Sequence, residues 1–335
     1  MNSTYLIVFT ATLAFAVTGL LGFKLIPWLR KLKYGQTILD IGPVWHKNKQ
    51  GTPTMGGILF IVGVVVALVG VTCLDFFTNK SIISETGVQK VRLWGGLLMA
   101  LGFGLIGFID DYIKVVKKRN LGLTAMQKTL FQLVVGIGYL ITLYLSYGSR
   151  MYIPFVGDVN LGIFYCPLGL FIIYSAVNAV NLTDGIDGLC TSVTFIVAVA
   201  FMVGAGIFQQ QGMSVLAAAL AGGCAGFLVW NWNPAKVFMG DTGSMFLGGL
   251  VVALAFGLNV PLILIPMGII YIIETGSVVI QIFYFKLTKG KRLFKMTPIH
   301  HHFEMSKWSE IKIVTVFSII TLIGCAAGVA ILYYG

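Results

Sequence analysis

Two adjacent carboxylates, Asp110 and Asp111, are followed by Lys114 in an otherwise apolar part of the sequence. On a helix, Lys114 would share a face with both acids, because residues three and four apart are neighbours. The two carboxylates repel each other, which raises the proton affinity of one of them or favours binding of a divalent cation. The alternative interpretation is an anchor at the membrane interface with an intrahelical ion pair.

The segment NAVNLTDGIDG, residues 178–188, is the densest polar cluster. Its candidate ligand-binding residues are Asn178, Asn181, Asp184, Gly185 and Asp187. Glycines permit an irregular backbone that can bring oxygen atoms or N–H groups to a ligand. A polar turn with side-chain caps would account for one or two of these residues but not for all of them. We therefore interpret the segment as functional.

The segment FMGDTGS, residues 238–244, precedes another apolar stretch and contains Asp241. Asp241 could be a helix N-cap. The N-terminus of a helix also attracts phosphate, and an aspartate there can hold Mg²⁺ against it. Phe238 could be an interfacial aromatic residue or a platform on which a nucleobase stacks.

Residues 47–57, KNKQGTPTMGG, contain Lys47 and Thr52 and suggest phosphate binding. The segment lacks the Lys-Ser/Thr ending of a Walker A loop. A basic loop attracted to anionic lipids is the alternative.

Residues 297–304, TPIHHHFE, hold three of the four histidines of the chain, namely His300, His301 and His302. Adjacent histidines point in different directions and rarely bind one metal ion, so a zinc site is disfavoured. Nearby cations favour anion recognition or proton transfer. The alternative is a solvated loop.

Two further features lie inside apolar stretches. GFGLIG, residues 102–107, spells GxGxxG but follows no predicted strand, so it indicates close helix packing rather than a dinucleotide site. Glu274 is a functional candidate because ionisable residues are costly inside a membrane. A structural acid with a buried partner is the alternative.

The composition of the 335 residues indicates a membrane protein. The residues AVILMFWYC make up 57% of the chain and charged residues 10%, whereas soluble domains carry about 25% charged residues. So few charges cannot cover a soluble surface, which excludes a cytosolic globule, a disordered tail and a coiled coil. The five cysteines are scattered without a CxxC pair, so neither a disulfide framework nor a zinc site is expected.

We predict an all-α, polytopic integral membrane protein with a single transmembrane domain over residues 1–335. A spanning helix needs about 20 mainly apolar residues. The first apolar run is expected to be a retained helix, because no Lys or Arg precedes it. The ten candidate spans lie near residues 4–26, 55–75, 92–110, 125–146, 161–180, 188–208, 213–231, 243–259, 261–285 and 311–334.

The basic residues are distributed unequally between the two sets of loops. If both termini are outside, the inner side holds all 23 Lys and Arg residues except Lys80, Lys90, Arg92 and Arg150. The positive-inside rule therefore predicts that both termini are outside and that the five polar motifs face the cytoplasm. Carboxylates for Mg²⁺, cations for phosphates and an aromatic ring for a base fit transfer of a phosphorylated group from a soluble nucleotide to a lipid phosphate.

The motifs KNKQGTPTMGG, DDYIK, NAVNLTDGIDGL, FMGDTGS and PIHHHFE carry a family resemblance. On them, and along its whole length, the sequence resembles the phospho-N-acetylmuramoyl-pentapeptide transferase family, within the polyprenyl-phosphate N-acetylhexosamine-1-phosphate transferase superfamily. The resemblance implies a multi-pass enzyme of the bacterial cytoplasmic membrane with its active site toward the cytoplasm. Its expected reaction joins UDP-MurNAc-pentapeptide and undecaprenyl phosphate with Mg²⁺ to give lipid I and UMP, the first membrane step of peptidoglycan synthesis.

The resemblance also implies roles for individual residues. Asp241 is the expected Mg²⁺ ligand, Asp110 and Asp111 the catalytic pair, and Phe238 the ring that stacks on uracil. The three histidines are expected near the diphosphate or sugar, in the catalytic centre. The expected substrate-binding residues are Lys47, Thr52, Lys114, Lys118, Asn178, Asn181, Asp184, Gly185, Asp187, Asn231 and Phe238. A homodimer in the lipid bilayer is expected, and no nucleic-acid partner.

Several alternatives stay open. One aspartate of the pair either attacks the β-phosphate to form a phospho-enzyme or acts as a base toward undecaprenyl phosphate. A relative that uses UDP-N-acetylglucosamine is the nearest competing function, and the PIHHHFE motif argues against it. An ion-coupled transporter would explain Glu274, but transporters usually show paired repeats and sites at the membrane midplane.

Overall fold

The computed structural model describes residues 3–31, 49, 51–77, 86–116 and 121–335. Ten helices of this described part are long and apolar enough to cross a membrane, which confirms the predicted all-α membrane fold. They are α1 (Ser3–Lys31), α2 (Gly57–Phe77), α4 (Gly96–Val116), α5 (Ala125–Tyr147), α6 (Tyr165–Thr183), α7 (Leu189–Ile207), α8 (Gln211–Asn231), α9 (Gly240–Gly257), α11 (Ile269–Leu287) and α13 (Glu310–Tyr334).

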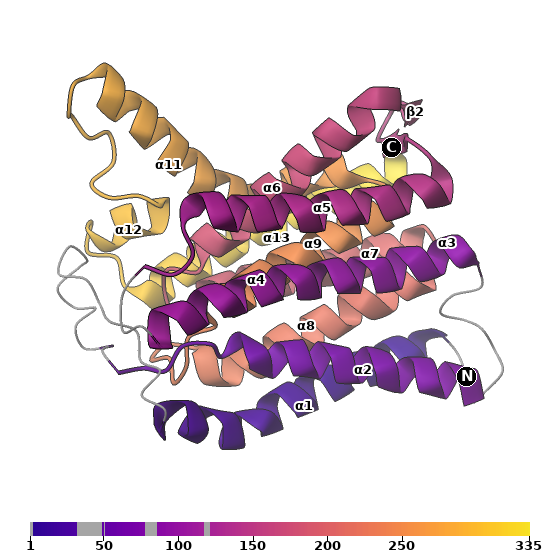
Figure 1. Cartoon of the computed structure of the whole chain (residues 1–335), viewed down its shortest axis with the longest axis horizontal. Coiled ribbons are helices and arrows are strands. Elements are labelled where there is room, and N and C mark those ends of the chain that lie inside the picture. The colour runs from indigo at the N-terminus through magenta and orange to yellow at the C-terminus, as the bar shows by residue number, and fades with distance from the viewer. Residues whose placement is uncertain (1–2, 32–48, 50, 78–85, 117–120) are drawn as a thin grey trace.

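Short elements connect these helices. They are α3 (Gly87–Lys90), α10 (Leu264–Met267), α12 (Ile299–Glu304), a π-helical turn (Val91–Gly95), two 3₁₀ turns (Gly162–Phe164 and Pro261–Ile263) and an antiparallel hairpin of β1 (Arg150–Ile153) and β2 (Gly157–Asn160). The long helices form an elongated bundle with the chain termini near the same end, and α12 lies at the opposite end (Figure 1). Which end faces the cytoplasm stays a prediction.

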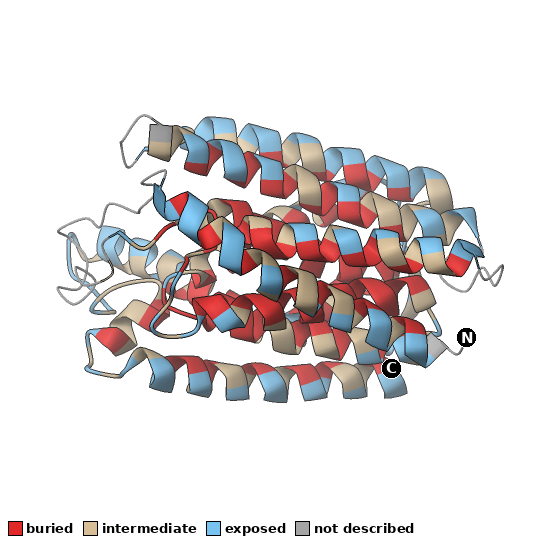
Figure 2. Ribbon diagram, turned by 90° about the horizontal axis from the view of Figure 1, so that it is seen from below, coloured by how far each residue is buried: buried red, intermediate tan, exposed pale blue. Residues whose placement is uncertain are grey.

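Helix α9 forms the centre of the bundle. Every residue from Thr242 to Gly257 is buried, as expected for a helix that is apolar on all sides. It packs most extensively against α4 and also contacts α6, α2 and α7. The outer helices bury only the faces that turn toward this centre (Figure 2). Their exposed faces carry large apolar side chains such as Leu98 and Leu145, which suits contact with lipid.

Two segments differ from the sequence-based prediction. The expected span 261–285 is divided into a 3₁₀ turn, α10 and α11, with the break at Gly268. A kink at Pro266 is expected from the sequence, because proline has no N–H to donate to the Leu262 carbonyl four residues earlier. The hairpin of β1 and β2 between α5 and α6 was not predicted, because its strands are only four residues long.

The GFGLIG segment packs closely against its neighbours, as predicted. A β-carbon at Gly102 or Gly104 would lie 3.1 Å from Val135 of α5 or 3.2 Å from Phe246 of α9. A β-carbon at Gly107 would overlap the carbonyl oxygen of Asp241. These glycines therefore let α4 approach the helix that carries Asp241.

Gly107→Ala is expected to lower the free energy of unfolding by about 1–3 kcal/mol, because overpacking forces the two backbones apart. By displacing Asp241 from α4 it should also reduce the transferase turnover that the family resemblance implies, by up to about 100-fold, since small displacements of catalytic groups are costly. The matched control is Gly138→Ala on α5, where a β-carbon meets nothing within 4 Å. Thermal unfolding in detergent and turnover should separate the variants; equal behaviour would contradict the role of Gly107.

Candidate active site

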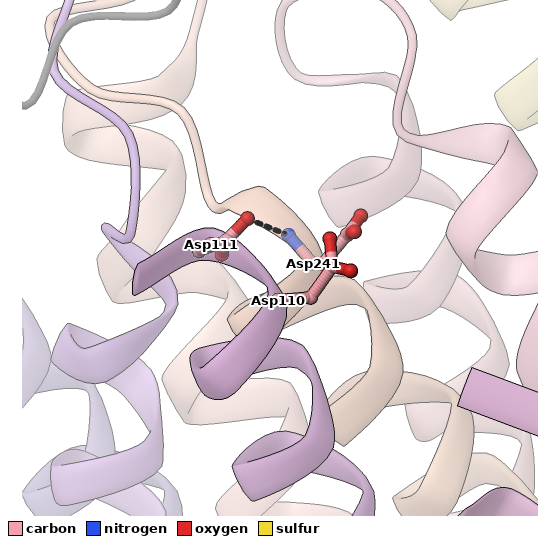
Figure 3. A group of neighbouring side chains, drawn as sticks. All are labelled: Asp110, Asp111 and Asp241. Atoms are coloured by element: carbon pink, nitrogen blue, oxygen red, sulfur yellow. Dashed lines mark hydrogen bonds between the residues drawn. The ribbon is translucent and has the colours of Figure 1, made fainter. Parts of the chain in front are cut away.

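Three carboxylates converge where the end of α4 meets the start of α9. Asp110 and Asp111 lie in the last turns of α4, and Asp241 lies in the first turn of α9. One oxygen from each carboxylate lies within 4.8 Å of the others. Figure 3 shows the carboxylates of Asp110 and Asp241 side by side, while Asp111 turns toward the backbone of Asp241. The three predicted residues thus belong to one site.

Asp111 holds the N-terminus of α9. Its carboxylate accepts hydrogen bonds from the backbone N–H groups of Asp241 (3.3 Å) and Thr242 (2.9 Å) and from the Thr242 hydroxyl (2.7 Å). A carboxylate at this position satisfies free N–H groups of the helix and interacts favourably with its dipole. In this arrangement Asp111 is a structural link between α4 and α9.

Asp110 and Asp241 are joined through lysine side chains. The Lys114 ammonium lies 2.6 Å from Asp110 and 2.9 Å from Asp241. Lys114 and Asp110 thus share a helix face as predicted, and they form the intrahelical ion pair of the alternative interpretation. Lys128, from the first turns of α5, lies 3.1 Å from Asp241. Asp110 also accepts a hydrogen bond from the backbone N–H of Leu123 (2.8 Å).

Asn181 is the member of the 178–188 segment that contacts this centre directly. Its amide donates to Asp241 (2.9 Å) and lies 2.7 Å from the Ser244 hydroxyl. Burial raises the pKa of the nearby Asp184 well above its usual value, and the charges of Asp241, Asp111 and Asp187 raise it further.

The side chain of Asn178 is bound by groups outside the carboxylate cluster. Its side chain is engaged by Gln132 of α5 (2.9 Å) and by the Tyr174 carbonyl (2.8 Å).

Asp187 and Asn231 bind other parts of the protein. Asp187 forms an ion pair with Lys49 (2.7 Å) and accepts from the backbone N–H of Ala235 (2.9 Å). Lys49 also pairs with Glu310 at the start of α13 (2.6 Å). Asn231 accepts from the Thr191 hydroxyl (3.0 Å) and donates to the Val237 carbonyl. These contacts hold the loop between α6 and α7 against the loop before α9.

The predicted nucleotide-binding segments lie beside each other. The Phe238 N–H donates to the Pro53 carbonyl, and the Gly56 N–H donates to the Phe238 carbonyl, both at 2.8 Å. Thr52 is half-buried next to this pairing, and the ring of Phe238 is partly exposed. Lys47 and Lys118 lie outside the described residues.

The three histidines on α12 have separate hydrogen-bond partners. His300 lies 3.0 Å from Glu274 of α11, and His301 lies 2.6 Å from Glu304. His302 accepts from the backbone N–H of Lys295 (3.1 Å). His300 also lies against Gly185, where a β-carbon would overlap its ring. Glu274 therefore has a buried partner, His300, which was one of the two alternatives considered from the sequence.

Lys128 was missed as a site residue by the sequence reasoning. A signal was present: Lys128 lies in the first turn of a helix, where a positive charge opposes the helix dipole unless it has an acidic partner. Lys49 and Glu310 were missed because their pairing depends on three loops that are distant in sequence.

The carboxylate cluster fits a hard divalent cation. Mg²⁺ prefers oxygen ligands and is usually bound by one or two carboxylates together with water and substrate phosphates. Asp110 and Asp241 offer adjacent carboxylates, whereas the oxygens of Asp111 already accept hydrogen bonds from α9. Asp241 and Asp110 are thus the residues that could hold such an ion.

Comparison with known proteins finds relatives along almost the whole chain. The family model of glycosyl transferase family 4 matches residues 93–259, and the phospho-N-acetylmuramoyl-pentapeptide-transferase signature 1 matches residues 49–61. The chain is 44% identical to the phospho-N-acetylmuramoyl-pentapeptide-transferase of Listeria welshimeri, over 99% of this chain and 100% of the relative. It is 46% identical to the protein of the same name from Acetivibrio thermocellus, over 96% of this chain and 94% of the relative.

Proposed function

The chain belongs to the phospho-N-acetylmuramoyl-pentapeptide transferase family, and from this we propose that it transfers phospho-MurNAc-pentapeptide from UDP-MurNAc-pentapeptide to undecaprenyl phosphate. The observation that carries the proposal is the convergence of Asp110, Asp111 and Asp241 at one end of the bundle. Phosphoryl transfer depends mainly on positioning and on neutralising charge. A cluster of carboxylates and lysines is suited to both tasks.

In the proposed reaction, an oxygen of undecaprenyl phosphate forms a bond to the β-phosphorus of the donor. The bond between that phosphorus and the oxygen bridging to the α-phosphate breaks, so the products are lipid I and UMP. In the phospho-enzyme alternative, a carboxylate oxygen of Asp110 forms the first bond and the lipid phosphate displaces it. Asp110 is the better candidate for either role, because one of its oxygens is bound only by the flexible Lys114 side chain, whereas Asp111 is held by the N-terminus of α9.

Mg²⁺ bound by Asp241 and Asp110 would neutralise the diphosphate and polarise the bond that breaks. Lys114 and Lys128 already neutralise these carboxylates. When phosphates enter, their ammonium groups can turn to the phosphate oxygens, because lysine side chains are flexible point charges. Asn181 keeps Asp241 oriented through its amide.

Nucleotide binding is assigned to the neighbouring loops. Phe238 would stack on uracil, with Thr52, Asp184 and Gly185 nearby and with Lys47 and Lys118 as further phosphate contacts. Asp187 and Asn231 would act by holding these loops in place, since their side chains bind protein groups. His301 and His302 would contact the donor near its sugar.

We place the enzyme in the bacterial cytoplasmic membrane, with the carboxylate cluster toward the cytoplasm and both termini outside. The excess of Lys and Arg in the loops near the cluster supports this orientation. A soluble nucleotide donor and a lipid acceptor can meet at this boundary. A homodimer and a single domain over residues 1–335 remain part of the proposal.

The direct test is turnover of UDP-MurNAc-pentapeptide with undecaprenyl phosphate by the purified protein, measured as UMP release and lipid I formation. Both products should appear with Mg²⁺ and disappear with EDTA. Preferential use of UDP-N-acetylglucosamine would favour the related transferase. Ion flux in proteoliposomes without Mg²⁺-dependent UMP release would favour a transporter.

Phe238→Ala is expected to raise the KM for UDP-MurNAc-pentapeptide roughly 5- to 150-fold, because stacking of a base on an aromatic ring contributes about 1–3 kcal/mol. Phe238→Tyr keeps a ring at this position and should retain most of the affinity. Steady-state kinetics with saturating lipid acceptor gives both values. An unchanged KM in Phe238→Ala would exclude stacking on this ring.

A further inference from the structure

Glu274 and His300 form a buried pair at the boundary between α11 and α12. Both side chains are fully inaccessible to solvent, and the Nδ1 atom of His300 lies 3.0 Å from Oε2 of Glu274. A carboxylate buried within a membrane-spanning helix destabilises the protein unless a partner compensates its charge. The pair is therefore a specific arrangement rather than a surface contact.

Each member of the pair keeps a second polar atom that is buried without a hydrogen-bond partner in the described chain. These atoms are Oε1 of Glu274 and Nε2 of His300. Buried polar atoms are nearly always satisfied, so an unsatisfied one calls for a functional explanation or a bound ligand. The Nε2 atom is the more informative of the two, because the residue that it faces is known.

The Nε2 atom of His300 points at the turn formed by Asp184 and Gly185. A β-carbon placed on Gly185 would overlap this atom, so only glycine lets the ring approach here. Gly185 itself is exposed. The turn belongs to the segment whose Asn181 contacts Asp241, and this connects His300 to the carboxylate cluster.

The contact of Glu274 with Nδ1 bears on which ring nitrogen of His300 carries the proton. An ionised carboxylate only accepts hydrogen bonds, so with Glu274 in that form Nδ1 would be the protonated nitrogen. In the neutral ring, Nε2 then keeps a lone pair and is an acceptor. A carboxylate that orients a histidine in this way is known from catalytic triads.

We propose that Glu274 is a positioning residue that orients His300 and fixes its tautomer, so that Nε2 is held as an acceptor beneath the exposed Asp184–Gly185 turn and bonds to the donor substrate when binding displaces that turn. This inference rests on the proposed function. The substrate group must be a hydroxyl or an amide N–H, because a neutral Nε2 has no proton to offer a phosphate. The sugar and peptide part of the donor carries such groups.

The tautomer can be measured without turnover. The chain has four histidines, so ¹⁵N-histidine labelling of the full-length protein in detergent gives few signals, and His300→Asn identifies those of His300. At mildly alkaline pH we expect a protonated Nδ1 and an unprotonated Nε2. Adding UDP-MurNAc-pentapeptide without lipid acceptor should shift the Nε2 signal.

Glu274→Leu removes the acceptor while keeping an apolar side chain of similar size. We expect the His300 tautomer signature to be lost and kcat/KM to fall about 10- to 100-fold, the effect of losing one hydrogen bond to a charged group. Glu274→Gln retains an acceptor oxygen and should restore both readouts in large part. Glu304→Leu removes the partner of His301, whose ring lies 4.1 Å from that of His300, and should leave the tautomer of His300 unchanged.

The inference is overturned if His300 carries its proton on Nε2 in the wild type, if donor substrate leaves the Nε2 signal unmoved, or if Glu274→Leu retains wild-type kcat/KM. An equal loss of activity in Glu274→Gln and Glu274→Leu, with matching drops in Tm, would show a purely structural role. Absence of transferase activity in the wild type would refute the proposed function instead, while the NMR signals would still report the pairing.

Discussion

Asp241→Asn is expected to reduce turnover of UDP-MurNAc-pentapeptide by at least about 1,000-fold, the largest effect of any single substitution in this site. A bound divalent ion stabilises transition-state charge by several kcal/mol, and each 1.36 kcal/mol corresponds to a factor of ten in rate. Asparagine has the same shape but a much weaker ligand oxygen for Mg²⁺. It also leaves Lys114 and Lys128 without the charge that they share.

The loss should not be reversed by excess Mg²⁺, and it should not reflect unfolding. UMP release over a range of Mg²⁺ concentrations, together with the thermal unfolding midpoint, gives both answers. Asp158→Asn, an exposed acid in strand β2, is the control for general effects of removing a carboxylate. Substantial activity of Asp241→Asn at saturating Mg²⁺ would contradict the ligand role.

Asp110→Asn and Asp111→Asn are expected to fail in different ways, although the residues are adjacent in sequence. Both side chains are buried, but Asp111 accepts three hydrogen bonds at the N-terminus of α9, whereas Asp110 accepts one backbone hydrogen bond, from Leu123. Removing the charge of Asp111 should lower the free energy of unfolding by about 1–3 kcal/mol, because hydrogen bonds to a charged group and the helix dipole are both weakened. Activity should fall with it.

Asp110→Asn should leave the unfolding midpoint near that of the wild type and still reduce turnover at least about 100-fold, the scale of losing a general base or a nucleophile. Measuring unfolding and turnover for both variants under identical conditions separates positioning from chemistry. Equal destabilisation of the two variants would refute this division of roles. A radiolabel chase for an aspartyl-phosphate on the wild type would then distinguish the phospho-enzyme from direct attack.

Local regularities made part of the site predictable from sequence. The contact of Lys114 with Asp110 follows from helical periodicity alone, and it is present at 2.6 Å. The glycines of GFGLIG pack closely against α5 and α9 because small residues let membrane helices approach. In both cases, the interacting groups are set by spacing within a single helix or by residue size.

Other assignments needed the packed structure. The sequence offered Asp110 and Asp111 as an equivalent pair, but Asp111 bonds to Thr242, 131 residues away. Asn178 stood beside Asn181 in one motif, yet only Asn181 bonds to Asp241, because Asn178 lies almost one turn farther from the end of α6 and is bound by Gln132. The partner of Glu274 could not be inferred either, since α12 approaches α11 only after the intervening loop turns back.

The membrane class and the ten spanning helices were determined by sequence alone, because a bilayer requires about 20 apolar residues for each crossing and that requirement is written in consecutive positions. Tertiary structure alone decided which carboxylate oxygens accept hydrogen bonds from α9 and which nitrogen of His300 faces the Asp184–Gly185 turn. Those properties depend on the contact between α4 and α9 and on the approach of α12 to α11. Hydrogen bonds act over about 3 Å, and packing alone brings groups so far apart in the chain within that distance.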